Sequence, residues 1–350
     1  MTEERSGGLG GAVDWELAAR TGVRLARPGP TSTREAAEAV VAELADASVR
    51  AEQPVRDVTG LADGLPVPQA RIVDRAGWIR AAAASMANLT GEEGGRAAGL
   101  LGGRPAGLQA GAMLAFLSSA ILGQYDPFTG EHGTLLLVAP NVVGVERALK
   151  VPSHDFRLWV CLHEVTHRVQ FSSAPWIGDH MRETVATLGA VGDDSVSDLV
   201  RRLAEVLRNR RPGQDQAPED RGILGLLRAT QAEPQREALD RLLMLGTLLE
   251  GHADHVMDAV GPAVVPSVAR IRRAFDQRRV RAASPLQRLV RALLGVDAKM
   301  AQYVRGKAFV DAVVGEVGMT EFNAIWTGPE TLPRTAEIEN PRAWIDRVLA

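Results

Sequence analysis

The run LWVCLHEVTHRVQF, residues 158–171, places two histidines four positions apart within a mostly apolar segment. Residues four apart lie on the same face of an α-helix, about one turn from each other. His163 and His167 can therefore direct a ring nitrogen at one point, while Glu164 is rotated by about 100° from the first histidine. The pattern predicts a helix that begins near Pro152 and presents both histidines to a common ligand.

The His-Glu-x-x-His pattern carries a chemical mechanism as well as a geometry. Catalytic zinc binds imidazole nitrogens and usually has three protein ligands and one open position for water. Glu164 would flank such an ion and accept the proton of the zinc-bound water, acting as general base and then as proton donor. The alternative interpretation is a buried helix whose two histidines are ordinary core or surface groups.

A third metal ligand has to come from elsewhere in the chain. The extension His-x-x-Gly-x-x-His is excluded, because Gln170 and Ser173 occupy its last two positions. The segment LLEGHADHVMDAVG, residues 248–261, offers Glu250 and Asp254, which are four apart and share a helical face. We expect Glu250 to bind the metal and Asp254 to accept the free N–H of a ligand histidine.

Several other residues could take part in this site. His252 and His255 lie in the same segment as Glu250, and either could be the third ligand or a donor to the oxyanion. Glu183 is a rival ligand, although no aspartate follows it four residues later. An oxyanion donor is needed because attack on an amide develops negative charge. Tyr303 is the candidate for this role, and half-buried packing is the alternative interpretation.

The rest of the chain predicts a mainly α fold, α+β with a small sheet. Helices are expected at 28–49, 76–89, 108–123 and 340–349, and between about 180 and 315 apart from a surface loop at 209–220. A capping box of Ser32 and Glu35 would begin the first of these helices. The segment 133–143 gives the clearest strand signal, and its 133–140 part could be an edge strand that pairs with an extended substrate. We expect residues 1–11 to be disordered and 12–350 to form one domain.

Composition excludes several functional classes. The formal net charge is −3, so no overall field attracts nucleic acid or an anionic membrane. The longest apolar stretch, 111–123, is too short to span a bilayer. Cys161 is the one cysteine, so no intramolecular disulfide forms. It precedes His163 by two positions and should point largely away from the metal face, so we interpret it as a small core residue and not as a nucleophile. The start of the chain lacks a secretory pattern, so we expect a cytoplasmic protein.

The segments HEVTH and EGHAD resemble the gluzincin metallopeptidases. More narrowly, ILGQYDPF, LLLVAPNV, DFRLWVCLHEVTHRVQF and LLEGHADHVMDAVG are similar to a largely actinobacterial set of zincin-like hydrolases, which is associated with biosynthesis of the deazaflavin coenzyme. The similarity runs from about VDWELAARTG to the C-terminus. The resemblance implies a helix-rich zincin-like fold and a zinc peptidase or hydrolase activity, and it supplies no substrate.

Together these observations predict a zinc-dependent hydrolase of gluzincin type, a peptidase acting on a peptide or other amide. His163, His167 and Glu250 would bind zinc, which a set of two histidines and one glutamate with an open position suits. The alternative is a metal-binding scaffold or interaction protein in coenzyme metabolism. Glu164 argues against that alternative, because a purely structural site has no use for an unligated carboxylate. The sequence leaves the oligomeric state open.

Overall fold

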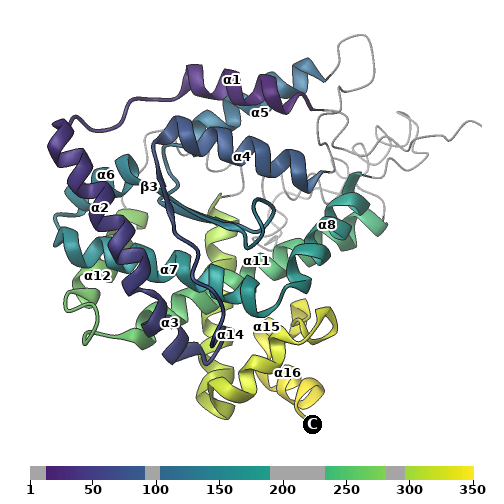
Figure 1. Cartoon of the computed structure of the whole chain (residues 1–350). Helices are drawn as coiled ribbons and strands as arrows, with labels where there is room; N and C mark the ends of the chain where they lie inside the picture. Colours follow the sequence, from purple (N-terminus) through teal and green to yellow (C-terminus); the bar gives the residue numbers. More distant parts are fainter. Residues whose placement is uncertain (1–12, 91–102, 190–232, 281–295) are drawn as a thin grey trace, which may run out of the picture.

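Helices predominate in the computed structural model, which describes residues 13–90, 103–189, 233–280 and 296–350 (Figure 1). A three-stranded sheet lies among them. These two observations confirm the prediction of a mainly α fold with a small sheet. The predicted disordered N-terminus and the predicted loop at 209–220 lie outside the described residues.

The sheet consists of β1 (Arg71–Val73), β2 (Gly123–Asp126) and β3 (Thr134–Val138), in the order β1-β3-β2. β3 pairs with β1 in parallel and with β2 in antiparallel orientation. The prediction of an edge strand at 133–140 is therefore wrong, because β3 has a partner on each side. Within the described residues β2 is the edge strand nearest the histidines.

Side chains of β3 alternate between two cores. Leu135 and Leu137 pack with α7 (Ser153–Ser173), whereas Leu136 and Val138 pack with α4 (Arg75–Leu89). Successive residues of a strand point to opposite faces, so burial on both sides requires the continuous apolar run LLLV. The sheet therefore separates two helical layers, and α7 lies directly against one of its faces.

On the α4 side, α1 (Trp15–Leu25) and α5 (Arg104–Leu117) cover the outer surface (Figure 1). On the α7 side lie α2 (Arg34–Arg50), α3 (Glu52–Thr59), α6 (Ala139–Leu149), α8 (Trp176–Gly189), α11 (Glu233–Val260), α12 (Val268–Val280) and α14 (Val296–Phe322). The chain ends with two short 3-10 helices, Asn323–Trp326 and Pro329–Thr331, and with α15 (Thr335–Glu339) and α16 (Pro341–Val348). A further core joins α8, α11, α14 and α16.

Three predicted element boundaries need correction. The N-cap of α2 is Thr33, whose hydroxyl accepts from the backbone N–H of Ala36, so the capping box at Ser32 is wrong by one residue. The helix expected at 108–123 ends at Leu117, and Gly123 already belongs to β2. The strand expected to reach 143 ends at Val138, because α6 begins there with a proline in its first turn, where the fixed φ suits a helix.

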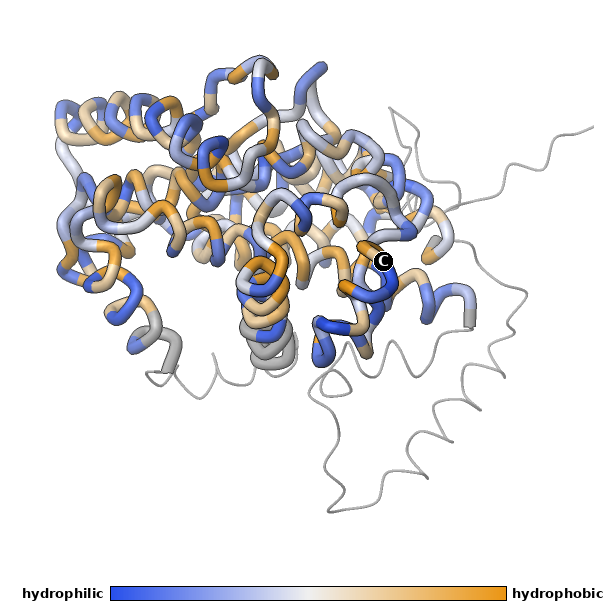
Figure 2. Tube along the Cα trace, turned by 90° about the horizontal axis from the view of Figure 1, so that it is seen from below, coloured by the Kyte–Doolittle hydropathy of each residue, from blue (hydrophilic) through white to orange (hydrophobic). Residues whose placement is uncertain are grey.

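Several helices are amphipathic, among them α1, α3 and α16, and Figure 2 shows hydrophobic and hydrophilic residues alternating along parts of the trace. This alternation is typical of helices that bury one face against a core. Among the described helices, none combines the length and apolar character needed to cross a bilayer.

Candidate metal centre

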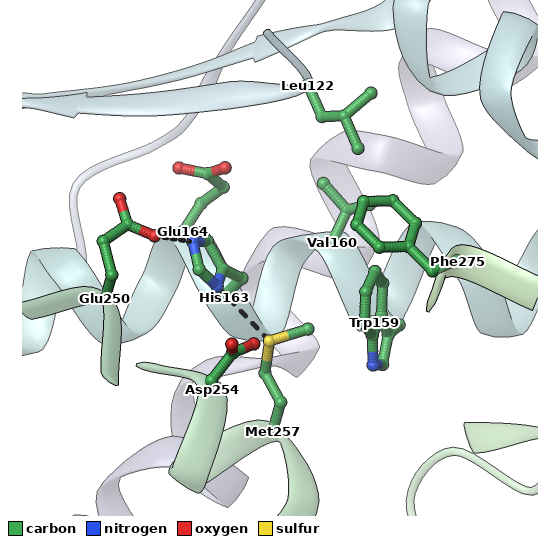
Figure 3. A pocket seen from close by; sticks show the side chains of 9 residues that line it. All are labelled: Leu122, Trp159, Val160, His163, Glu164, Glu250, Asp254, Met257 and Phe275. Atoms are coloured by element: carbon green, nitrogen blue, oxygen red, sulfur yellow. Dashed lines mark hydrogen bonds and ion pairs between the residues drawn. The ribbon is translucent and has the colours of Figure 1, made fainter. Parts of the chain in front are cut away.

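Helices α7 and α11 bring the three predicted ligands together. The Nε2 atoms of His163 and His167 lie 3.2 Å apart. Glu250 reaches them from α11, with one carboxylate oxygen 3.4 Å from His163 Nε2 and the other 3.9 Å from His167 Nε2. One donor atom from each of the three residues lies within 4.8 Å of the others. Figure 3 shows Glu250 pointing at His163 across the gap between the helices.

The charges within this triangle favour a cation. Burial lowers the pKa of His163, but the hydrogen bond and charge of Glu250 outweigh it and raise the pKa to about 9. Burial and the charge of His163 lower the pKa of His167. The His163 ring therefore holds an extra proton, and the neighbouring His167 ring stays neutral. Two imidazole nitrogens and one carboxylate thus face a common point, and this set of donors fits a catalytic zinc ion.

Glu164 lies beside the triangle, beneath the edge strand. A Cβ atom at Gly123 of β2 would be 2.6 Å from the Glu164 carboxyl carbon, so only glycine leaves room for this side chain. Burial raises the pKa of Glu164 to about 7, against the opposing charge of His163. A carboxyl group with a pKa near neutrality can both accept and donate a proton.

Two buried arginines fix α7 on either side of the motif. Arg157 forms a two-pronged ion pair with Glu146 of α6, with N···O distances of 2.6 and 3.0 Å. Arg168 pairs with Glu52 of α3 and donates to the carbonyl oxygen of Pro68 at 2.6 Å. Losing one partner of a buried pair is costly, so these contacts hold the histidines at a set position.

Gln170 connects the histidine helix to the glutamate helix. Its side-chain oxygen lies 2.9 Å from His167 Nδ1. Its amide nitrogen donates to the Leu249 carbonyl at 3.0 Å and lies 2.9 Å from His252 Nδ1. In the sequence, Gln170 serves only to exclude another motif. The available signal was its position three residues after His167, which places both side chains on one helical face.

The comparison with known families agrees with this geometry. A family model described as zincin-like metallopeptidase matches residues 13–345. The chain belongs to the zincin-like metallopeptidase family. This membership confirms the zincin-like part of the sequence resemblance and implies a zinc cofactor. The actinobacterial origin and the deazaflavin association stay predictions.

A solved structure is similar to this zincin-like protein over nearly its whole length. It is the crystal structure of a candidate hydrolase with a novel fold from Chloroflexus aurantiacus. The two chains are 30% identical, the TM-score is 0.66, and the match covers 96% of this chain and 98% of the other. No curated protein matches the chain. Family and neighbour together indicate a hydrolase.

In this zincin-like protein Asp254 has a different partner from the predicted one. Its carboxylate accepts from Arg272 of α12 at 3.0 Å. The Nδ1 atom of His163 instead lies 3.3 Å from the Met257 sulfur, and that of His167 faces Gln170. The predicted hydrogen bond from a ligand histidine to Asp254 is therefore absent among the described contacts, because an arginine occupies this carboxylate.

Among the other candidates, His252, His255 and Glu183 are not part of the triangle. His255 Nδ1 lies 2.7 Å from an oxygen of Asp311 on α14, and His252 is fully buried against aromatic rings. Glu183 is exposed on α8. Tyr303 belongs to α14, but its side chain lies outside the described part of the structure. The three ligands and Glu164 therefore form the site that the described residues support.

Cys161 contributes to the core, as the sequence predicts. Its side chain is fully buried, its sulfur lies 3.9 Å from the Leu44 carbonyl oxygen, and burial raises the pKa of the thiol. A thiol whose pKa is raised by burial is a poor nucleophile.

Proposed function

We propose that this protein is a zinc-dependent hydrolase that cleaves an amide bond, most simply a peptidase. One observation carries the proposal: His163, His167 and Glu250 converge beside the buried carboxyl group of Glu164, and all but His167 line the same cavity. When bound there, zinc would lower the pKa of a water molecule and polarise the substrate carbonyl.

The proposed chemistry assigns a proton path to Glu164. The carboxylate accepts a proton from the attacking water as the water oxygen bonds to the amide carbon. Glu164 then passes this proton to the leaving nitrogen as the C–N bond breaks. A pKa of about 7 suits both steps, because general acid–base catalysis is most efficient when the pKa lies near the working pH.

We further propose that the substrate backbone aligns along β2. This strand is the edge of the sheet within the described residues, and its Gly123 lies directly against Glu164. An open strand edge offers unpaired backbone groups to an extended peptide. We therefore assign pairing with an extended substrate, which the sequence suggested for residues 133–140, to β2 (Gly123–Asp126).

The decisive test combines metal content with one substitution. We expect about one zinc per chain by elemental analysis and cleavage in a peptide-library screen. Glu164→Gln should keep the zinc and lose hydrolysis by on the order of 10²-fold or more, because an amide cannot accept the water's proton. Glu183→Gln, an exposed glutamate on α8, is the matched control and should retain activity.

Two results would contradict the proposal. Loss of zinc in Glu164→Gln would make this residue a ligand and not the base. A zinc-loaded wild type that cleaves no library member would instead support the alternative of a metal-binding scaffold.

A further inference from the structure

A cavity of about 170 Å³ lies beside the ligand triangle, between α7, α11 and α12 (Figure 3). Its lining among the described residues divides into a polar group (His163, Glu164, Glu250 and Asp254) and an apolar group (Leu122, Trp159, Val160, Met257 and Phe275). An apolar protein cavity of roughly 150 Å³ accepts benzene. The space therefore suits one ring or one branched aliphatic group.

The apolar wall continues from the same helices that carry the ligands. Val160 precedes His163 by three positions, and Met257 follows Glu250 by seven, so each lies on the ligand-bearing face of its helix. At the far end, the rings of Trp159 and Phe275 pack edge to face with centroids 5.3 Å apart. In Figure 3 these two rings lie on the side of the cavity opposite Glu250.

The charges around the cavity favour a neutral occupant. Among the described lining residues, Asp254 is the one acid that is not part of the proposed zinc chemistry, and it pairs with Arg272 at 3.0 Å. The same guanidinium lies over the Trp159 ring, 5.6 Å from its centroid. A cationic group entering the cavity would find this carboxylate already paired and would lose its hydration.

We propose that this cavity is the specificity pocket, and that it takes a neutral aromatic or branched aliphatic group adjacent to the bond that is cleaved. The inference rests on the proposed hydrolase function, since the triangle defines where that bond lies. Phe275 and Leu122 are its specificity-determining residues. Both are only partly buried, so they can be changed with less risk to the core than Trp159.

Hydroxamates test the pocket because they bind zinc whatever group they carry. Affinities of the zinc-loaded full chain are compared for acetohydroxamate, phenylacetohydroxamate and the hydroxamate of 6-aminohexanoic acid. We expect the phenyl group to tighten binding by about 10- to 100-fold over the methyl group, as burial of a ring implies. The aminoalkyl group should give no such gain.

Two substitutions test whether the tighter binding of phenylacetohydroxamate arises in the cavity. Phe275→Ala and Leu122→Phe should each remove most of the preference for phenylacetohydroxamate and leave acetohydroxamate affinity unchanged. Phe116→Ala is the matched control, because this phenylalanine is 44% exposed on α5 and remote from the cavity. It should keep the wild-type preference.

The outcomes separate the pocket from the zinc site. Equal affinity for the methyl and phenyl compounds, or a preference for the aminoalkyl compound, overturns the pocket and leaves the zinc site intact. If no hydroxamate binds, the zinc site fails, and saturation-transfer NMR of phenylacetamide with zinc-free protein decides the pocket. A signal that Leu122→Phe abolishes supports the pocket, and the absence of a signal in wild type overturns it.

Discussion

At the scale of single residues, the amide of Gln170 determines how His167 presents its ring. The amide nitrogen has two acceptors, the Leu249 carbonyl and His252 Nδ1. The amide oxygen is therefore left to accept from His167 Nδ1, which leaves Nε2 of that ring without a proton. Zinc would bind the unprotonated nitrogen, so Gln170 would prepare His167 for the proposed metal.

We predict that Gln170→Ala weakens zinc binding by about 10- to 100-fold without abolishing it, as loss of a residue that orients a ligand does. Competition with a chelator of known affinity measures the effect. Gln53→Ala, an exposed glutamine on α3, is the control and should bind zinc as wild type does. Unchanged affinity in Gln170→Ala would show that the ring is oriented by packing alone.

Glu250 and Asp254 should respond differently to substitution. Glu250→Ala removes a ligand, and the two remaining histidines cannot hold catalytic zinc, so we expect the metal to be lost. Asp254→Asn disturbs the contact with Arg272 and leaves every ligand in place, so its loss of affinity should stay below about tenfold. Equal zinc content in wild type and Glu250→Ala, measured by elemental analysis, would refute the ligand assignment.

The convergence of His163, His167 and Glu250 was predictable at this scale, whereas the contacts that support it were not. A spacing of four on one helix aligns His163 with His167, and a carboxylate in a second helical segment pointed to Glu250. The partners of Gln170 and Asp254 depend on which helices cross and at which residue. That information is not contained in the spacing within a single helix.

At the scale of elements, α11 and α14 touch backbone to backbone. A Cβ atom at Gly251 would be 2.3 Å from the carbonyl carbon of Gly306. A Cβ atom at Gly306 would be 2.2 Å from the backbone carbonyl oxygen of Thr247. Distances this short leave no space for a methyl group. Because Gly251 follows Glu250, the crossing also fixes the position of this proposed third ligand.

We predict that Gly306→Ala destabilises the protein by about 1–3 kcal/mol, the usual cost of overpacking, and weakens zinc binding by shifting α11. Gly315→Ala in the same helix is the control, because nothing lies within 4 Å of a Cβ at that position. Alanine there should stabilise the helix by about 0.5–1 kcal/mol. Urea denaturation measures both variants, and equal stability of the two would contradict the close crossing.

Element boundaries were harder to predict than element types. The tetrapeptide GQYD becomes strand β2 because β3 provides a pairing partner, while its own sequence has little strand character. The apolar run before it continues the helical pattern, which explains the overlong helix predicted at 108–123. The pairing of β2 with β3 therefore ends the helix earlier than the local helical preference of residues 108–123 would.

At the scale of the whole molecule, zinc at the proposed site would link α7, which carries the two histidines, to α11, which carries Glu250. The two helices pack against different neighbours. We predict that metal removal lowers the melting temperature by on the order of 5 °C, since a ligand at 100 times its Kd contributes about 2.7 kcal/mol. Calorimetry with and without a chelator measures the shift. Glu250→Ala should melt at the same temperature in both conditions, and a chelator effect in that variant would place the stabilising metal elsewhere.

The buried arginine pairs on either side of the His-Glu-x-x-His motif have a consequence for synthesis of the chain. They attach α7 to α3 and α6, which precede α7 in the sequence and are therefore synthesised before it. Glu250 belongs to α11, which is made later and is held in place by α14, made later still. The histidines are thus in position early, but the centre is completed only when the last long helix has docked. If the proposed function holds, we expect a nascent chain to have no hydrolytic activity until α14 has docked.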